Sequence, residues 1–185
     1  PEAMYIYQIK DAEGKKRTGV IATTAIEEYL NGSMRLHEKT IIDSQDLQTE
    51  LLIKRKAAIK PILLTYPAIE ELETLVADYI ENNKKFYVIQ LGKEKHRFWQ
   101  ITEGAVQTQL KQIFAEKMPH AYIADGHHRA ASFAALHETA PTDKPDKMLC
   151  AYFPENSLNI HAFHRVVKDL NGLTADQLFD HLRTD

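Results

Sequence analysis

Apolar and polar side chains alternate near the start of the chain, which is the pattern of a half-buried β-strand. In residues 4–10 the aromatic and aliphatic side chains occupy every second position and so fall on one face. A polar stretch around Gly14 follows, and residues 18–24 return as a second strand-like run. This order predicts a β-hairpin formed by residues 4–10 and 18–24.

The rest of the chain mixes short apolar runs with helical periods. We expect further strands at 62–66, 86–91, 96–101, 121–124, 148–153 and 159–163. Helices are predicted at 24–30, 45–59, 67–81, 104–116, 127–138 and 175–183. Two more hairpins follow, one from 86–91 with 96–101 and one from 148–153 with 159–163. Because hairpins and helices interleave irregularly, the sequence predicts an α+β fold with a mixed sheet and flanking helices, in one domain over residues 1–185.

Composition and charge limit the class of protein. Lys and Arg total 23 against 26 Asp and Glu, so the net charge is −3 and nucleic acid is not an expected partner. Cys150 is the only cysteine, which excludes an internal disulfide and a cysteine-based metal cluster. The sequence has no long apolar run and no signal peptide, so we expect a cytoplasmic protein without a membrane partner. Since the chain starts at Pro1 without an initiator Met, we expect a fragment of a longer protein.

The strongest chemical signal is the segment 125–129, with the sequence Asp-Gly-His-His-Arg. A predicted strand ends here, Gly126 allows a tight turn, and a predicted helix begins at once. The first N–H groups of a helix attract anions. His127, His128 and Arg129 add hydrogen-bond donors, and the planar guanidinium suits phosphate oxygens. The segment therefore predicts a phosphate-binding turn.

Asp125 is the unusual member of this segment. A carboxylate at the edge of an anion site is unfavourable unless it caps the helix, binds a metal ion or accepts a proton. The simpler alternative is that Asp125 is an N-cap and that both histidines are solvated on the first helical turn. Two His and one Arg in direct succession favour the functional interpretation.

Residues 37–40 form a second candidate segment, with the sequence His-Glu-Lys-Thr. Four chemically active side chains in a region of weak periodicity are typical of a functional loop. Glu38 could act as a general base and Lys39 as a phosphate ligand. The alternative without function is a charged helical turn.

A third segment, residues 161–167, alternates like the end of a strand and contains His164 and Arg165. By itself a His-Arg pair lies more often on the protein surface than in a functional site. A functional role for this segment therefore depends on the other two segments. The sequence has neither a Gly-x-x-x-x-Gly-Lys-Ser/Thr loop nor a Gly-x-Gly-x-x-Gly turn. A nucleotide would therefore be bound by a motif other than these two.

Together the three segments resemble the widespread bacterial domain-of-unknown-function 1015 family. The resemblance rests on the Asp-Gly-His-His-Arg segment, on His-Glu-Lys-Thr at 37–40 after Gly-Ser-Met-Arg at 32–35, and on Phe-His-Arg-Val-Val at 163–167. Order and spacing fit along nearly the whole chain, and the N-terminal stretch of the family would precede Pro1. This family is distantly similar to the ParB/sulfiredoxin superfamily, in which a Gly-x-His/Arg-Arg turn at a helix start binds nucleotide phosphates. Free L-serine kinases of that superfamily have the same Asp-Gly-His-His-Arg turn.

The resemblance implies a nucleotide-dependent kinase, with ATP or ADP and Mg²⁺ as cofactors and free L-serine as the leading small hydroxyl-bearing substrate. The phosphate ligands would be Gly126, His127, His128, Arg129, Lys39 and Arg165. The catalytic residues would be Glu38, Asp125 and His128. Of these, Glu38 or Asp125 would take the hydroxyl proton. Further contacts to the substrate would come from His37, Thr40 and His164.

Two other functions stay open. A ParB-like nucleotide-binding switch would act through a protein or nucleic-acid partner, and the near-neutral charge counts against DNA. A metal-dependent phosphohydrolase would place a transition metal among His37, His127, His128 and His164. Adjacent histidines rarely bind one ion together, which counts against the second alternative. We further expect the three segments to converge in the fold, and since they lie about 90 and about 35 residues apart, only the tertiary structure can bring them together.

Overall fold

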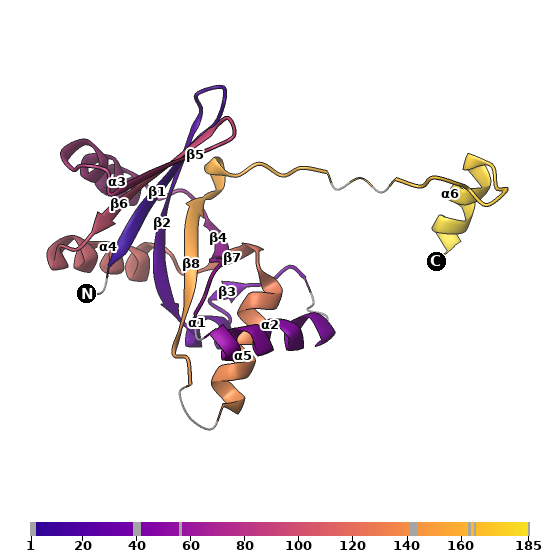
Figure 1. Ribbon diagram of the computed structural model, residues 1–185, viewed down its shortest axis with the longest axis horizontal. Coiled ribbons are helices and arrows are strands. Elements are labelled where there is room, and N and C mark those ends of the chain that lie inside the picture. The colour runs from indigo at the N-terminus through magenta and orange to yellow at the C-terminus, as the bar shows by residue number, and fades with distance from the viewer. Residues whose placement is uncertain are drawn as a thin grey trace.

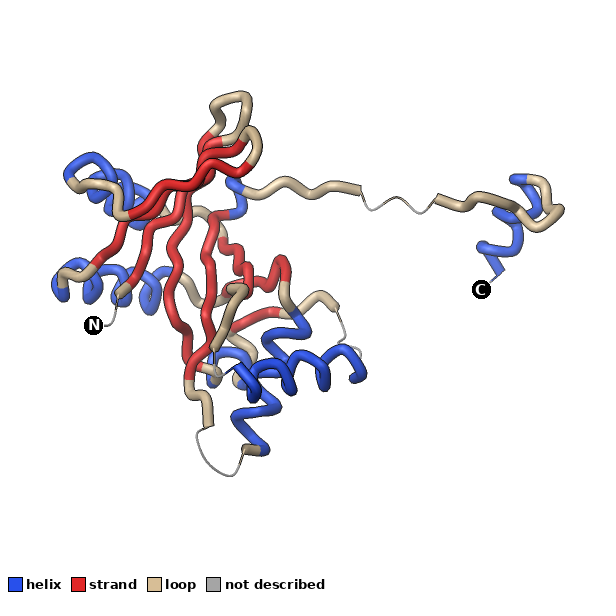
Figure 2. The backbone as a smooth tube through the Cα atoms, viewed as in Figure 1, coloured by secondary structure: helices blue, strands red, loops and turns tan. Residues whose placement is uncertain are grey.

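The structure is a computed structural model that describes residues 3–38, 42–55, 57–140, 144–162, 164 and 166–184. Within these ranges the chain has an α+β fold built on one eight-stranded mixed sheet. Figure 1 labels the strands and helices, and Figure 2 shows the strands crossing the main body with helices at both ends of the sheet. The fold class predicted from the sequence is confirmed.

One half of the sheet consists of two hairpins. β1 (Met4–Lys10) pairs antiparallel with β2 (Lys16–Ala25) on one side and with β6 (Glu94–Ile101) on the other. β5 (Tyr87–Leu91) pairs with β6 and forms an edge of the sheet. Both hairpins that the sequence predicts in this half are present, because each is specified by alternating side chains and a short polar turn.

The other half of the sheet is assembled from strands that are distant in sequence. β8 (Lys147–Pro154) lies antiparallel to β2 and parallel to β4 (Ile62–Tyr66). β4 pairs in turn with β7 (Ala121–Asp125), beside which the two-residue β3 (Met34–Arg35) runs parallel. The strand order is therefore β3-β7-β4-β8-β2-β1-β6-β5. This half positions the candidate site, since β7 ends in the Asp-Gly-His-His-Arg segment.

Helices lie at the two ends of the sheet, except for the C-terminal helix, which lies away from it (Figure 1). In the described part of the chain they are α1 (Glu27–Leu30), α2 (Ile42–Arg55), α3 (Glu70–Asn82), α4 (Gly104–Lys117), α5 (His127–Thr139) and α6 (Ala175–Thr184). α3 and α4 lie beside β1 and β6, whereas α2 and α5 pack together near β3 and β7 (Figure 1). None of the helices in the described ranges combines the length and the apolar character that a membrane crossing requires.

The core between the sheet and its helices is apolar. Trp99 on β6, Leu110 on α4 and Ile123 on β7 are almost completely buried. Removing one such side chain from water stabilises the fold by about 1.5–3 kcal/mol. Ile123 matters for the candidate site, because its burial fixes β7 just before the strand reaches the phosphate-binding turn.

The third predicted hairpin is wrong. After β8 the chain forms a short 3-10 turn, η1 (Glu155–Ser157), and residues 159–162 are not a strand. The reason is that β8 is already paired with β2 on one side and with β4 on the other, so it has no free edge for a returning strand. This segment instead extends away from the sheet toward α6 (Figure 1), and Ile160 is fully exposed.

Some element boundaries also differ from the prediction. α3 begins at Glu70 and not at residue 67, because Ile69 has an extended backbone with φ −119° and ψ 106°. α2 ends at Arg55, before the predicted residue 59. The pattern of side chains does not predict β3, since two residues are too few to show alternation.

Candidate functional site

The junction between β7 and α5 is a tight strand-to-helix turn. β7 ends at Asp125 and α5 begins at His127, so Gly126 alone connects them. Gly126 has a φ of +106°, in the left-handed region where other side chains are strained. A Cβ atom at this position would also lie 2.6 Å from Nη2 of Arg129. The backbone conformation therefore favours glycine, and a side chain here would also displace the guanidinium of Arg129.

Among the described residues, no side chain caps the N-terminal end of α5. The N–H group of Ala130 donates to the carbonyl oxygen of Gly126 at 3.0 Å, which is the first helical hydrogen bond. The N–H groups of residues 127–129 consequently have no acceptor within the helix. Such a helix start carries partial positive charge and suits an anion. The alternative that Asp125 caps the helix is not what the structure shows.

Asp125 pairs with a guanidinium instead. Nη2 of Arg129 donates to Oδ2 of Asp125 at 2.7 Å and to the carbonyl oxygen of Pro61 at 3.2 Å. Nζ of Lys60 lies 3.5 Å from the same carboxylate oxygen. The hydrogen bond from Arg129, together with the positive charges of Arg129 and Lys60, lowers the pKa of Asp125 despite partial desolvation. Asp125 is therefore ionised at neutral pH and is a weak base.

His127 is buried against the segment that contains His37. Its side chain is only 4 % exposed, and the two rings pack edge to face with centroids 4.4 Å apart. The backbone N–H of His37 donates to Nε2 of His127 at 3.5 Å, a long contact that assigns the ring proton to Nδ1. Burial and, next, the charge of His37 lower the pKa of His127, against the opposing effects of Glu38 and Asp125. His127 is therefore mostly neutral at pH 7.

Glu38 lies beside both imidazoles and is open to solvent. Its Oε2 is 3.7 Å from Nδ1 of His127, and its Oε1 is 4.0 Å from Nε2 of His37. The side chain is 63 % exposed, so a molecule in solution can reach the carboxylate. The fold thus brings His37 and Glu38, from the second sequence segment, directly to the turn that follows β7.

His128 occupies the first turn of α5 and is half-buried. Its carbonyl oxygen accepts a hydrogen bond from the hydroxyl of Ser132 at 2.7 Å. Nδ1 of His128 and Nε of Arg129 are both buried, and neither has a hydrogen-bond partner among the described residues. A buried polar atom without a partner costs about 1–3 kcal/mol. Both atoms therefore favour a water or ligand atom at this turn.

The third sequence segment is not assembled with the other two in the described part of the chain. His164 is exposed, and it belongs to the segment that leads away from the sheet to α6 (Figure 1). Lys39, Thr40 and Arg165 lie outside the described residues, so their contacts with phosphate and substrate stay predictions. Within the described ranges, no group of three or more His, Cys, Asp or Glu side chains could hold a metal ion.

Lys60 and Pro61 belong to the site but have no signal in the sequence. They precede β4, and they contact Asp125 and Arg129 because β4 pairs with β7. Along the chain they resemble only the end of one helix and a break before the next strand. The register of two strands, which no local pattern specifies, brings them to the turn.

The profile of one protein family matches this chain. The family is described as Protein of unknown function (DUF1015), and the match covers residues 1–185. No curated protein and no solved structure gives a significant match. The matched range includes both segments that meet at the turn, and it agrees with the resemblance found from their motifs.

Proposed function

The chain belongs to the DUF1015 family, and from this premise we propose that it acts as a nucleotide-dependent kinase of a small molecule, with free L-serine as the leading acceptor. The observation that carries the proposal is the uncapped start of α5, with the buried His127 and the exposed Glu38 beside it. The helix start suits a phosphate, and the carboxylate suits a hydroxyl group that must lose a proton. The choice of serine and the ParB/sulfiredoxin-like character of the turn rest on the Asp-Gly-His-His-Arg motif.

Phosphate oxygens would accept hydrogen bonds from the N–H groups of residues 127–129. Arg129 would add positive charge beside these N–H groups while its Nη2 donates to Asp125. His127 would bind a phosphate as a donor through Nδ1, or as a cation once protonated. These donors fit a polyphosphate, whose charge is spread over several oxygens.

Glu38 is the stronger candidate for the base. It is exposed and lies next to two imidazoles, whereas Arg129 and Lys60 pair with Oδ2 of Asp125. In the proposed step the serine hydroxyl gives its proton to Glu38, a bond forms from the serine oxygen to the terminal phosphorus, and the bridging P–O bond of the nucleotide breaks. The shortened nucleotide leaves with the bonding electrons. Positioning and neutralisation of charge supply most of the catalysis in such reactions.

Mg²⁺ would be held by phosphate oxygens together with Oδ1 of Asp125, since Arg129 and Lys60 contact Oδ2 of that carboxylate. Mg²⁺ is commonly bound by one or two carboxylates together with phosphate oxygens, and when bound it neutralises charge on the transferred group. The ring of His37 packs against that of His127 and its Nε2 lies 4.0 Å from Glu38, so His37 would contact the acceptor next to the base. We place the reaction in the cytoplasm, where nucleotides and free amino acids are available.

The proposal is tested by measuring nucleotide binding and transfer separately. Isothermal titration calorimetry with ATP and with ADP, each with Mg²⁺, gives the affinity, and mass spectrometry after incubation with L-serine detects phosphoserine. Binding together with formation of phosphoserine supports the kinase. Binding without transfer to serine or to other small hydroxyl compounds would support the nucleotide-binding switch. If neither nucleotide binds, the phosphate-binding role of the turn is wrong.

A further inference from the structure

A cavity of about 490 Å³ lies at the opposite end of β7 from the phosphate-binding turn. Ala121, the first residue of β7, lines the cavity, whereas the turn follows the last residue, Asp125. At about 3.3 Å per residue, these two ends of the strand are about 13 Å apart. The volume is within the range of about 300–1,000 Å³ that is common for small-molecule sites. The cavity is therefore a second place where a ligand could bind.

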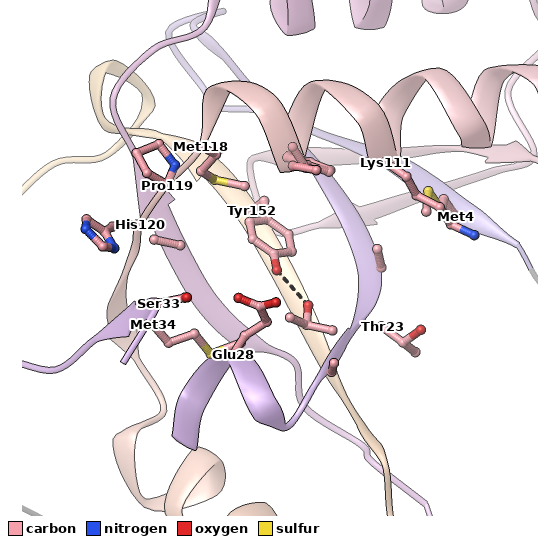
Figure 3. Close-up of a pocket in the computed structure, with 16 residues that line it drawn as sticks. Met4, Thr23, Glu28, Ser33, Met34, Lys111, Met118, Pro119, His120 and Tyr152 are labelled. Carbon is pink, nitrogen blue, oxygen red and sulfur yellow. Dashed lines mark hydrogen bonds between the residues drawn. The ribbon is translucent and has the colours of Figure 1, made fainter. Parts of the chain in front are cut away.

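One side of this cavity is rich in oxygen atoms. The hydroxyl of Tyr152 on β8 and the hydroxyl of Thr24 on β2 are 2.6 Å apart, and both residues line the cavity. Figure 3 shows the carboxylate of Glu28, on α1, next to this hydroxyl pair. Burial, then the nearby Cys150 and last the charge of Glu28 raise the pKa of Tyr152 against the hydrogen bond with Thr24, so its hydroxyl stays protonated. Together the three side chains offer hydrogen-bond acceptors and one full negative charge.

Other parts of the cavity lining are apolar and partly aromatic. Met34 on β3 is buried, and Phe114 and Met118 at the C-terminal end of α4 line the same space. The ring of Phe114 lies 5.1 Å from that of Tyr152, centroid to centroid. Methionine adapts to ligands of different shape, and aromatic faces attract cations. This wall suits the hydrocarbon body of a small molecule.

Glu28 carries the charge that selects the ligand. No other described residue forms a hydrogen bond or an ion pair with its carboxylate. Its neighbour Glu27 differs, because the carboxylate of Glu27 is 3.8 Å from Nε2 of His137 and does not line the cavity. Lys111 also lines the cavity, but Figure 3 shows it at the other end, next to Met4. A cation near the hydroxyl pair would thus meet a carboxylate that is exposed and has no cationic partner among the described residues.

We propose that this cavity binds a small organic cation, namely a primary amine with an apolar body. The ammonium group donates to Glu28 and to the hydroxyl oxygens of Thr24 and Tyr152, and the hydrocarbon part lies against Met34, Phe114 and Met118. The three N–H donors of an ammonium group match these three acceptors in number. This site is independent of the kinase proposal, since it uses none of the residues at the phosphate-binding turn.

Phenethylamine is a suitable probe, with phenethyl alcohol as the neutral control and hydrocinnamate as the anionic control. Titration of the isotope-labelled chain, followed by NMR, should show amide shifts at the residues that line the cavity when the amine is added. We expect the amine to bind at least about tenfold more tightly than the alcohol, the usual effect of a charge-assisted hydrogen bond. Hydrocinnamate, the anionic control, should not bind. Shifts confined to residues 125–129 would place the amine at the other site and overturn the proposal.

Two matched variants test the role of charge. Glu28→Gln should weaken binding of the amine about tenfold and leave the alcohol unaffected, since only the ion pair is lost. Glu27→Gln, on the same short helix, should leave both affinities unchanged. Phe114→Leu should weaken both the amine and the alcohol, because it removes an aromatic face and keeps an apolar side chain. Equal binding of amine and alcohol, or full affinity in Glu28→Gln, would overturn the proposal.

Discussion

The imidazole Nδ1 of His127 lies 3.7 Å from the carboxylate of Glu38, although the two residues come from different segments of the chain. His127 is fixed by the start of α5, and Glu38 follows the short strand β3. The contact arises because β3 runs parallel to β7, so that the segments after both strands leave the sheet at the same end. This pairing of strands, and not the spacing of residues, assembles the candidate site.

Replacement of Gly126 by alanine should destabilise the chain. The backbone has a φ of +106°, and a Cβ atom would lie 2.6 Å from Nη2 of Arg129, which is fixed by Asp125 and Pro61. We expect the free energy of unfolding to fall by about 1–2 kcal/mol, as measured by urea denaturation. Gly104→Ala is the matched control, since a Cβ atom there meets nothing within 4 Å. Equal stability of the two variants would show that the turn tolerates a side chain.

The stability of the chain should depend on pH through His127. Its pKa is lowered in the fold, mainly by burial, relative to the ordinary value of 6.5. At a pH between the pKa of His127 in the fold and about 6.5, the unfolded chain binds more protons than the folded chain. The contribution of His127 to the free energy of unfolding is therefore complete above about pH 6.5, and it is lost as the pH falls through the pKa of His127 in the fold. The loss cannot exceed about 1.4 kcal/mol per pH unit.

Urea denaturation between pH 5 and pH 8 measures this effect. His127→Gln should give a flatter curve of stability against pH than the unaltered chain. His161→Gln is the control, because His161 is exposed in the fold. A His127→Gln variant with an unchanged pH profile would assign the acid sensitivity to another group.

The sequence predicts the elements that depend on local signals. The two hairpins of β1, β2, β5 and β6 follow from side-chain alternation and polar turns, and the start of α5 follows from a glycine after a buried strand. The predicted hairpin after β8 is wrong, because each strand can pair with only two neighbours. Nothing in residues 159–163 shows that β2 and β4 already occupy both sides of β8.

For the candidate site, the sequence predicts the residue types better than their partners. Asp125 at a helix start is expected as a cap, a metal ligand or a base, and in the fold it pairs with Arg129 one turn ahead. Lys60 reaches the same carboxylate only through the register of β4 and β7. The sequence gives the functional group that a residue carries. Its contacts with residues on neighbouring strands decide whether that group is already paired or can bind a ligand.

Phosphate binding should be coupled to protonation of His127. An anion at the start of α5 favours the imidazolium form, which burial disfavours in the free chain. Nucleotide affinity should therefore rise as the pH falls from 8 to 6, with uptake of up to about one proton per nucleotide bound. Calorimetry in two buffers of different ionisation enthalpy measures this uptake. His127→Gln should abolish it, and an uptake that persists in that variant would place the responsible group elsewhere.

Arg129 and Glu38 should separate binding from turnover. Arg129→Ala removes a charged donor from the phosphate site, and we expect nucleotide affinity to fall about 10–100-fold. Glu38→Gln keeps the size of the side chain and removes the base, so affinity should stay within about twofold while phosphoserine formation falls about 10²–10⁴-fold.

Because Arg129→Ala also frees the carboxylate of Asp125, the double variant Asp125→Asn with Arg129→Ala serves as its control for charge balance. Affinity that recovers fully in the double variant would mean that Arg129 acts only by neutralising Asp125. Full turnover in Glu38→Gln would transfer the role of the base to Asp125, whose lowered pKa makes it the weaker proton acceptor.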